Sequence, residues 1–291
     1  MVSVFGDESA DETKQRVFAV SAILGVEDQW EAAETAWLRV LDGREFHAAF
    51  WESEYADHPD TSLHKKNLAT YRQLIDVLVS SGLCAYSLGL DIAAWRDVFG
   101  ADRPTYEPIR DVEYYKCFTD VISMVGKLMG GFGVPVQFTF DHRQESEYNA
   151  GRIYDIIVNQ PEWKQNNVFL RTKISFDSRS NPRIQMADLL AREAMKHLDN
   201  LTGPVQRPIR RSMLALVTAQ GRFFFDYYVR EYFESWYAQF DEAARRAGMS
   251  LESYSQWAHE RKLIDNMSTR VSYMLWLEAQ EALGGVSGDG A

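Results

Sequence analysis

The chain has 291 residues, of which 46% are hydrophobic and 25% charged, a composition typical of a soluble globular protein with a large buried core. No run of about 18 apolar residues is free of charges, and no basic-then-apolar segment opens the chain, so the sequence predicts neither a transmembrane helix nor a secretory signal. Two cysteines, Cys84 and Cys117, are too few for a disulfide framework and lack metal-site spacing, which favours a cytoplasmic protein.

The net charge of −11 is spread unevenly. Residues 1–60 carry 14 acidic and 4 basic side chains, whereas residues 164–211 carry 4 acidic and 10 basic ones. The acidic total therefore does not exclude a polyanionic partner, but it restricts the contact to the 164–211 segment. The alternative is that this segment is a solvated basic face.

The predicted elements alternate between strands and helices. Runs of β-forming residues predict strands, and apolar residues at helical spacing predict helices. In chain order, strands are expected from Val2 and at 16–24, 44–51 (a short one), 83–91, 134–141 and 167–177. Helices are expected at 27–41, 63–81, 110–129, 147–159 and 182–199. This order predicts an α/β protein with a mixed sheet flanked by helices.

The region after residue 200 is predicted to be a helical extension over 201–284, followed by a disordered glycine-rich tail at 285–291. Within it, aromatic residues recur at steps of four from Phe224 to Phe240, which predicts a wide aromatic stripe on one helix that packs on a helix at 251–283. The stripe could serve core packing, a homodimer interface or base stacking. Its acidic balance disfavours base stacking.

Three acidic residues stand at predicted strand ends: Asp7, Asp141 and Asp177. Strand ends are where an α/β sheet presents side chains to a site, although a single aspartate there is commonly a turn residue or a helix cap. Asp7 is followed directly by Glu8, and two adjacent carboxylates at the tip of a core strand require a cation nearby.

Asp188 lies inside the apolar stripe of the 182–199 helix, between Ile184 and Ala191. An isolated buried carboxylate is strongly disfavoured unless it is paired, protonated or bound to a metal. An ion pair with Arg192, four residues on, is one explanation. The other is that Asp188 reaches the strand tips and joins the acids there.

Glu45 and His47 alternate within the 44–51 segment, so on a strand they would face the same side. Together they could ligate a metal or handle a proton. The alternative is a histidine in a surface loop.

The motifs "FGDES", "EFH" and "IQMADLLA" together resemble the bacterial proteins of the domain of unknown function 3800 over residues 2–199. The resemblance implies an RNase H-like fold and a metal-dependent nuclease, in a family often found near mobile elements and phage-defence genes. One position departs from the family pattern: Ala10 stands where a glycine is usual.

The resemblance also implies roles for individual residues. Asp7, Asp141 and Asp188 would form the catalytic metal cluster. Glu45 and His47 match the E-x-H element, and Glu8 and Asp177 are further candidate metal ligands. Oxygen ligands without cysteine favour Mg²⁺ or Mn²⁺, two of which can drive phosphodiester hydrolysis of DNA or RNA. The residues expected to bind phosphate are Lys173, Arg179, Arg183, Arg192 and Lys196. The alternative is a non-catalytic RNase H-like module that binds nucleic acid or a protein.

Overall fold

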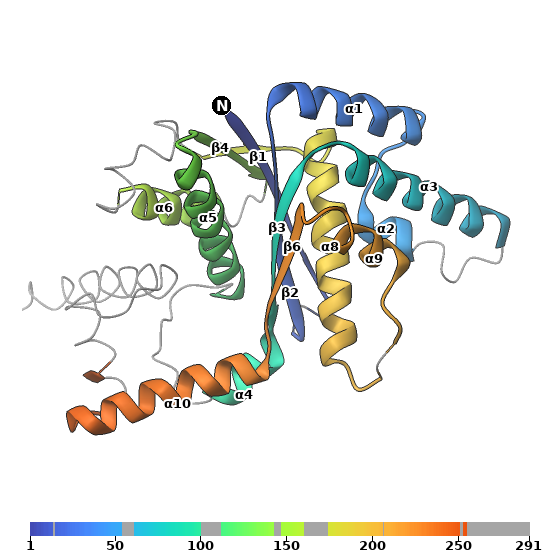
Figure 1. The fold of residues 1–291 in the computed structure, drawn as a ribbon. Helices are drawn as coiled ribbons and strands as arrows, with labels where there is room; N and C mark the ends of the chain where they lie inside the picture. The colour runs from blue at the N-terminus through green and yellow to red at the C-terminus, as the bar shows by residue number, and fades with distance from the viewer. Residues whose placement is uncertain are drawn as a thin grey trace, which may run out of the picture.

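A computed structural model describes residues 1–13, 15–53, 61–99, 112–142, 147–159, 174–205, 207–250 and 253–254. Its centre is a six-stranded mixed sheet with helices on both faces (Figure 1), which confirms the predicted α/β class. The strands are β1 Val2–Ala10, β2 Val17–Gly25, β3 Cys84–Asp91, β4 Val136–Asp141, β5 Ser175–Asp177 and β6 Phe223–Tyr228. The helices in these ranges are α1 Glu27–Leu41, α2 Ala48–Ser53, α3 Thr61–Ser80, α4 Ile92–Phe99, α5 Val112–Phe132, α6 Glu147–Val158, α8 Pro182–Thr202, α9 Arg211–Val217 and α10 Arg230–Ala247.

The strand order across the sheet is β5-β4-β1-β2-β3-β6. The first three strands pair antiparallel in chain order, whereas β4 runs parallel to β1, β5 parallel to β4 and β6 parallel to β3. Because β4 is parallel to β1 and pairs with it, residues at the end of β4 lie beside the second half of β1. The end of β5 lies beside the end of β4. β1 itself continues past the end of β4 in its hairpin with β2, so Asp7 lies within the strand and not at its end.

The alternation of side chains along β1 separates two hydrophobic cores. Val2 and Val4 pack with α5 and α6, whereas Phe5 packs with α1, α3 and α8 on the other face. Figure 1 shows these two helical layers on opposite sides of the sheet. The predicted helix at 27–41 is confirmed as α1, which buries Trp30 and Trp37 against the sheet.

Helix α8 begins where the sequence predicts. The side chain of Asn181 caps its first turn by accepting a hydrogen bond from the Arg183 amide, and Pro182 occupies the first helical position, where no amide hydrogen is needed. The helix buries a broad face against β1, β2 and β3. Its small residues Ala187 and Ala191 are fully buried, which lets the helix lie close to the sheet.

The expectation that everything after residue 208 is helical is wrong. Residues 223–228 form β6, which pairs with β3, and only from residue 230 does the aromatic pattern lie on a helix, α10. The sheet therefore extends beyond the expected boundary at residue 200. Six successive strand residues rich in phenylalanine and tyrosine suit a pleated surface, and this local preference outweighs the four-residue spacing. The predicted helix at 251–283 and the tail at 285–291 lie outside the described residues, apart from residues 253–254.

The expected short strand at 44–51 is also absent. Residues 44–47 form an irregular segment that leads into α2, and Phe46 is its buried side chain, against the rings of Trp37, Trp51 and Tyr71. Aromatic packing therefore determines the conformation here. Among the described helices, none combines the length and the apolar composition needed to cross a bilayer.

Candidate active site

Asp7 and Asp141 are brought together by neighbouring parallel strands. Gly6 pairs with Phe140 in the β1–β4 register, so the next residue on each strand is an aspartate. Phe140 packs in the core beneath α5 and α6, so strand alternation turns both aspartates to the opposite face, towards α8. A Cβ atom on Gly6 would lie 2.4 Å from the Phe140 ring, so glycine permits this close pairing. Both carboxylates are buried, with exposed fractions of 5% and 3%.

Asp188 reaches the same place from α8. Its Oδ2 atom accepts a hydrogen bond of 2.8 Å from the backbone amide of Ala48, at the start of α2. The Nδ1 atom of His47 lies 3.4 Å from the same oxygen. That contact lacks the alignment of a hydrogen bond and is an electrostatic one. The segment before α2 is therefore attached to α8 through this carboxylate. An ion pair with Arg192 alone does not account for the position of Asp188.

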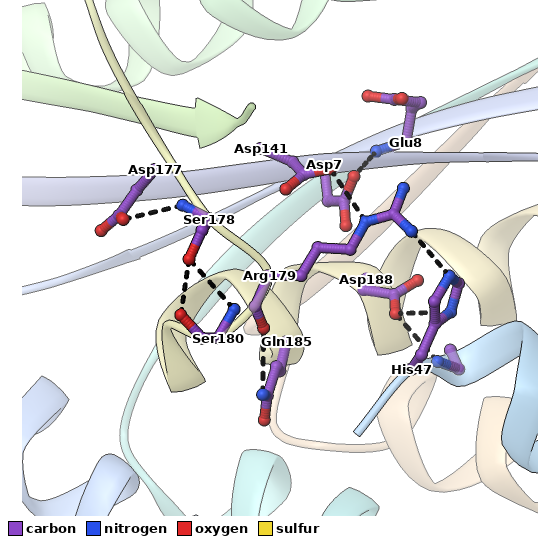
Figure 2. A network of polar contacts seen from close by, with 11 residues as sticks. Asp7, Glu8, His47, Asp141, Asp177, Ser178, Arg179, Ser180, Gln185 and Asp188 are labelled. Carbon is purple, nitrogen blue, oxygen red and sulfur yellow. Dashed lines mark hydrogen bonds and ion pairs between the residues drawn. The ribbon is translucent and has the colours of Figure 1, made fainter. Parts of the chain in front are cut away.

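Arg179 connects the two halves of the cluster (Figure 2). Its Nε atom lies 3.3 Å from Oδ2 of Asp141, and its Nη1 atom lies 3.0 Å from Nε2 of His47. The backbone that carries Arg179 is fixed by Gln185, whose Nε2 donates to the Arg179 carbonyl while its Oε1 accepts from Trp37. A single contiguous network thus runs from Asp141 through Arg179 and His47 to Asp188.

The carboxylates influence one another electrostatically. Burial raises the pKa of Asp7 well above its ordinary value, and the charges of Glu8, Asp188 and Asp141 raise it further. Burial likewise raises the pKa of Asp188, although the Ala48 amide, the neighbouring His47 ring and the charge of Arg179 oppose the shift. Asp7, Asp141 and Asp188 therefore form one cluster, in which negative charge is unfavourable without a cation.

The donor set of this cluster fits a hard divalent cation. Asp141 is almost fully buried, and its Oδ1 atom has no hydrogen-bond partner in the part of the chain that the structure describes. Among the same residues, no three or more His, Cys, Asp or Glu side chains already stand in a metal-ligating arrangement. Each acid instead has one oxygen engaged by a nitrogen: Asp7 by the Glu8 amide, Asp141 by Arg179 and Asp188 by the Ala48 amide.

Three further acids lie apart from this cluster. Asp177 is exposed, and its oxygens accept hydrogen bonds from the Ser178 amide and from Asn181, so it organises the loop before α8. Glu8 points away from the other acids in Figure 2, as strand alternation requires. Glu45 is exposed, in contrast to the half-buried His47, and residues 44–47 form no strand, so the alternation from which a shared side was expected is absent.

The basic residues separate into different groups. Arg183 is held by ion pairs with Glu27 and Glu34 of α1, so its charge is already compensated and it is a poor phosphate ligand. Arg192 and Lys196 follow Asp188 on α8 at steps of four and are partly exposed, which places them in a row leading away from the cluster. Lys173 lies outside the described residues.

Two groups at this site were not expected from the sequence in the roles they have. The amide of Ala48 is a backbone donor, which no residue pattern reveals. Gln185 belongs to the motif "IQMADLLA", and its polar side chain on the buried face of α8 was the available signal. Both amide atoms of this buried glutamine are hydrogen-bonded, so Gln185 fixes the Arg179 backbone relative to Trp37.

A comparison with protein-family models and a search of curated proteins both found no match for this chain. Its resemblance to the domain of unknown function 3800 therefore stays a prediction that rests on the three motifs.

Proposed function

We propose that this protein is a divalent-metal-dependent nuclease of RNase H-like fold, related to the domain of unknown function 3800. The observation that carries the proposal is the convergence of Asp7, Asp141 and Asp188 from β1, β4 and α8. These are the first-strand, mid-sheet and late-helix acids that the resemblance implies. The unpartnered, buried Oδ1 atom of Asp141 supports a cation at the cluster.

The three aspartates would hold Mg²⁺ or Mn²⁺, since these ions prefer oxygen ligands. When bound, such ions activate water and stabilise the leaving oxygen of a phosphodiester. His47 supplies a nitrogen at the edge of the cluster, oriented by its contact with Asp188, where it can accept a proton from a bound water.

The substrate we propose is DNA or RNA, bound through its phosphates. Arg192 and Lys196 extend from the cluster along α8, and Arg179 stands at the cluster itself. Binding through these side chains would weaken with added salt, because counterions released from phosphate oppose it. A role in phage defence or mobile-element biology is the part of the proposal that depends on the resemblance alone, whereas a cytoplasmic location rests on the low cysteine content.

The alternative function is a non-catalytic RNase H-like module that binds nucleic acid or a protein. The Arg179–Asp141 contact favours it, because a guanidinium already supplies a positive charge to the acids.

A homodimer formed through α10 is compatible with both functions. The side chains of Trp236, Tyr237 and Phe240 on this helix are only partly buried among the described residues.

The experiment that tests the nuclease proposal is a cleavage panel. Labelled single- and double-stranded DNA and RNA are incubated with Mg²⁺ or Mn²⁺ and either the native protein or an Asp7→Asn, Asp188→Asn double variant. Metal-dependent cleavage by the native protein alone supports the proposal. Binding without cleavage of any substrate, at equal strength for both proteins, supports the non-catalytic module.

A further inference from the structure

The guanidinium of Arg179 lies against the acid cluster. It contacts Oδ2 of Asp141 at 3.3 Å and Nε2 of His47 at 3.0 Å. Its positive charge also acts on Asp7 and Asp188, since both carboxylates raise the pKa of Arg179 along with Asp141, against the opposing effect of burial. One side chain thus interacts with every acid of the cluster.

The contact with His47 determines which ring nitrogen carries the hydrogen. Arginine stays protonated in proteins and has only donors, so Nη1 of Arg179 must donate and Nε2 of His47 must accept. The imidazole is then neutral, with its hydrogen on Nδ1 facing Asp188. The Nε2 lone pair, which is a good metal ligand or proton acceptor, is occupied by Arg179.

The Arg179 side chain is able to leave without disturbing the fold. It is 56% exposed, whereas the side chain of Asp141 beneath it, taken without its backbone, is 1% exposed. Its backbone is held separately, by the hydrogen bond from Gln185 to its carbonyl. Arg183, at the first turn of α8, differs: its side chain is 15% exposed and is held by two glutamates.

We propose that Arg179 is a built-in counterion that competes with the divalent cation for Asp141, and that cation binding releases it and frees Nε2 of His47 to accept a proton. This inference rests on the proposed metal centre. It assigns Arg179 two positions: on the acids when the cation is absent, and at the mouth of the site, available to a substrate phosphate, when the cation is bound. Metal binding would then prepare the site for its polyanionic substrate.

The test compares Mn²⁺ affinity among full-length variants without nucleic acid, by the electron paramagnetic resonance signal of the free ion. For Arg179→Gln, we expect the dissociation constant to fall by about tenfold, the effect of removing one charge-assisted contact between an exposed arginine and a buried carboxylate. Arg179→Lys, which keeps the charge, should stay close to the native protein. Arg245→Gln is the matched control, because it removes an arginine whose carboxylate partners, Asp241 and Glu242, are on α10.

Cleavage provides a second measurement with the opposite sign. Arg179→Gln should bind Mn²⁺ more tightly and yet cleave more slowly, whereas a merely structural role would weaken both; Arg179→Ala repeats the test if the glutamine variant misfolds. Equal or weaker Mn²⁺ binding by the glutamine variant overturns the inference and leaves the metal centre standing. Absence of Mn²⁺ binding from every protein, the native one included, overturns the metal centre itself.

Discussion

Replacing Asp7 by asparagine should stabilise the protein without metal and destabilise it, relative to the native protein, with metal. Asp7 is buried beside other acids, and its raised pKa means that its charged form is disfavoured in the folded state. Two like charges about 4 Å apart repel by roughly 4 kcal/mol at an effective dielectric constant near 20, and by less at larger separations. Arg179 compensates part of this repulsion, so we expect Asp7→Asn to gain about 1–2 kcal/mol in free energy of unfolding without metal.

The gain should depend on pH. A carboxyl group with a raised folded-state pKa binds more protons in the folded than in the unfolded protein, so native stability falls as pH rises from the ordinary aspartate value of 3.8 through the raised value. Asparagine does not titrate. The difference between the two proteins should therefore be smallest near pH 4, grow with pH and level off above the raised pKa.

Divalent metal should reverse the order. At 100 times its dissociation constant, a cation that binds only the folded state adds about 2.7 kcal/mol, and Asp7→Asn should lose most of that gain. The assay is thermal unfolding with EDTA and with Mn²⁺, where each kcal/mol shifts the midpoint by about 2–4 °C. Asp76→Asn, at an exposed position of α3, is the control. Two results at pH 8 would together refute the reasoning. Asp7→Asn would be less stable than the native protein without metal, and Mn²⁺ would raise the unfolding midpoint of both proteins equally.

Three other predictions concern single residues, and a fourth concerns the oligomeric state. His47→Ala should lower metal-dependent cleavage by about 10²-fold, as for loss of a general base, without changing the unfolding midpoint by more than a few degrees; equal activity removes His47 from the mechanism. Gly6→Ala should cost about 1–3 kcal/mol in urea unfolding because its Cβ would meet the Phe140 ring, and an unchanged midpoint would contradict the packing. Glu193→Ala should cost about 3–5 kcal/mol, because this fully buried carboxylate carries hydrogen bonds and an ion pair. Light scattering at micromolar concentration tests the homodimer: a monomer rejects it, and Trp236→Ala should then affect stability only.

The elements with a single strong periodicity were predictable from the sequence. Helices α1 and α8 have apolar residues at helical spacing, and α8 also has Asn181 and Pro182 at its start; both helices lie close to their expected bounds. The order β5-β4-β1-β2-β3-β6 was not predictable, because strand pairing depends on contacts between distant segments. The segment 223–240 is compatible with the period of a strand and with the period of a helix. Its pairing with β3 determined that residues 223–228 form a strand.

The candidate site was likewise predictable from the sequence only in part. The meeting of Asp7, Asp141 and Asp188 was expected from acids at predicted strand ends and from a charge inside an apolar stripe, for which a shared site was one of two explanations. The positions of the arginines did not follow. Arg179 and Arg183 are four residues apart in a basic segment, yet one contacts the acid cluster and the other is neutralised by α1. These partners lie between 38 and 156 residues away along the chain, a separation that local sequence does not encode.

The central claim is that Asp7, Asp141 and Asp188 share a divalent cation, and anomalous diffraction from crystals soaked in Mn²⁺ tests it most directly. The account predicts an anomalous peak about 2.1–2.2 Å from carboxylate oxygens of all three aspartates, with the Arg179 side chain moved away from Asp141. No peak at the cluster at millimolar Mn²⁺, with Arg179 still on Asp141, would contradict it.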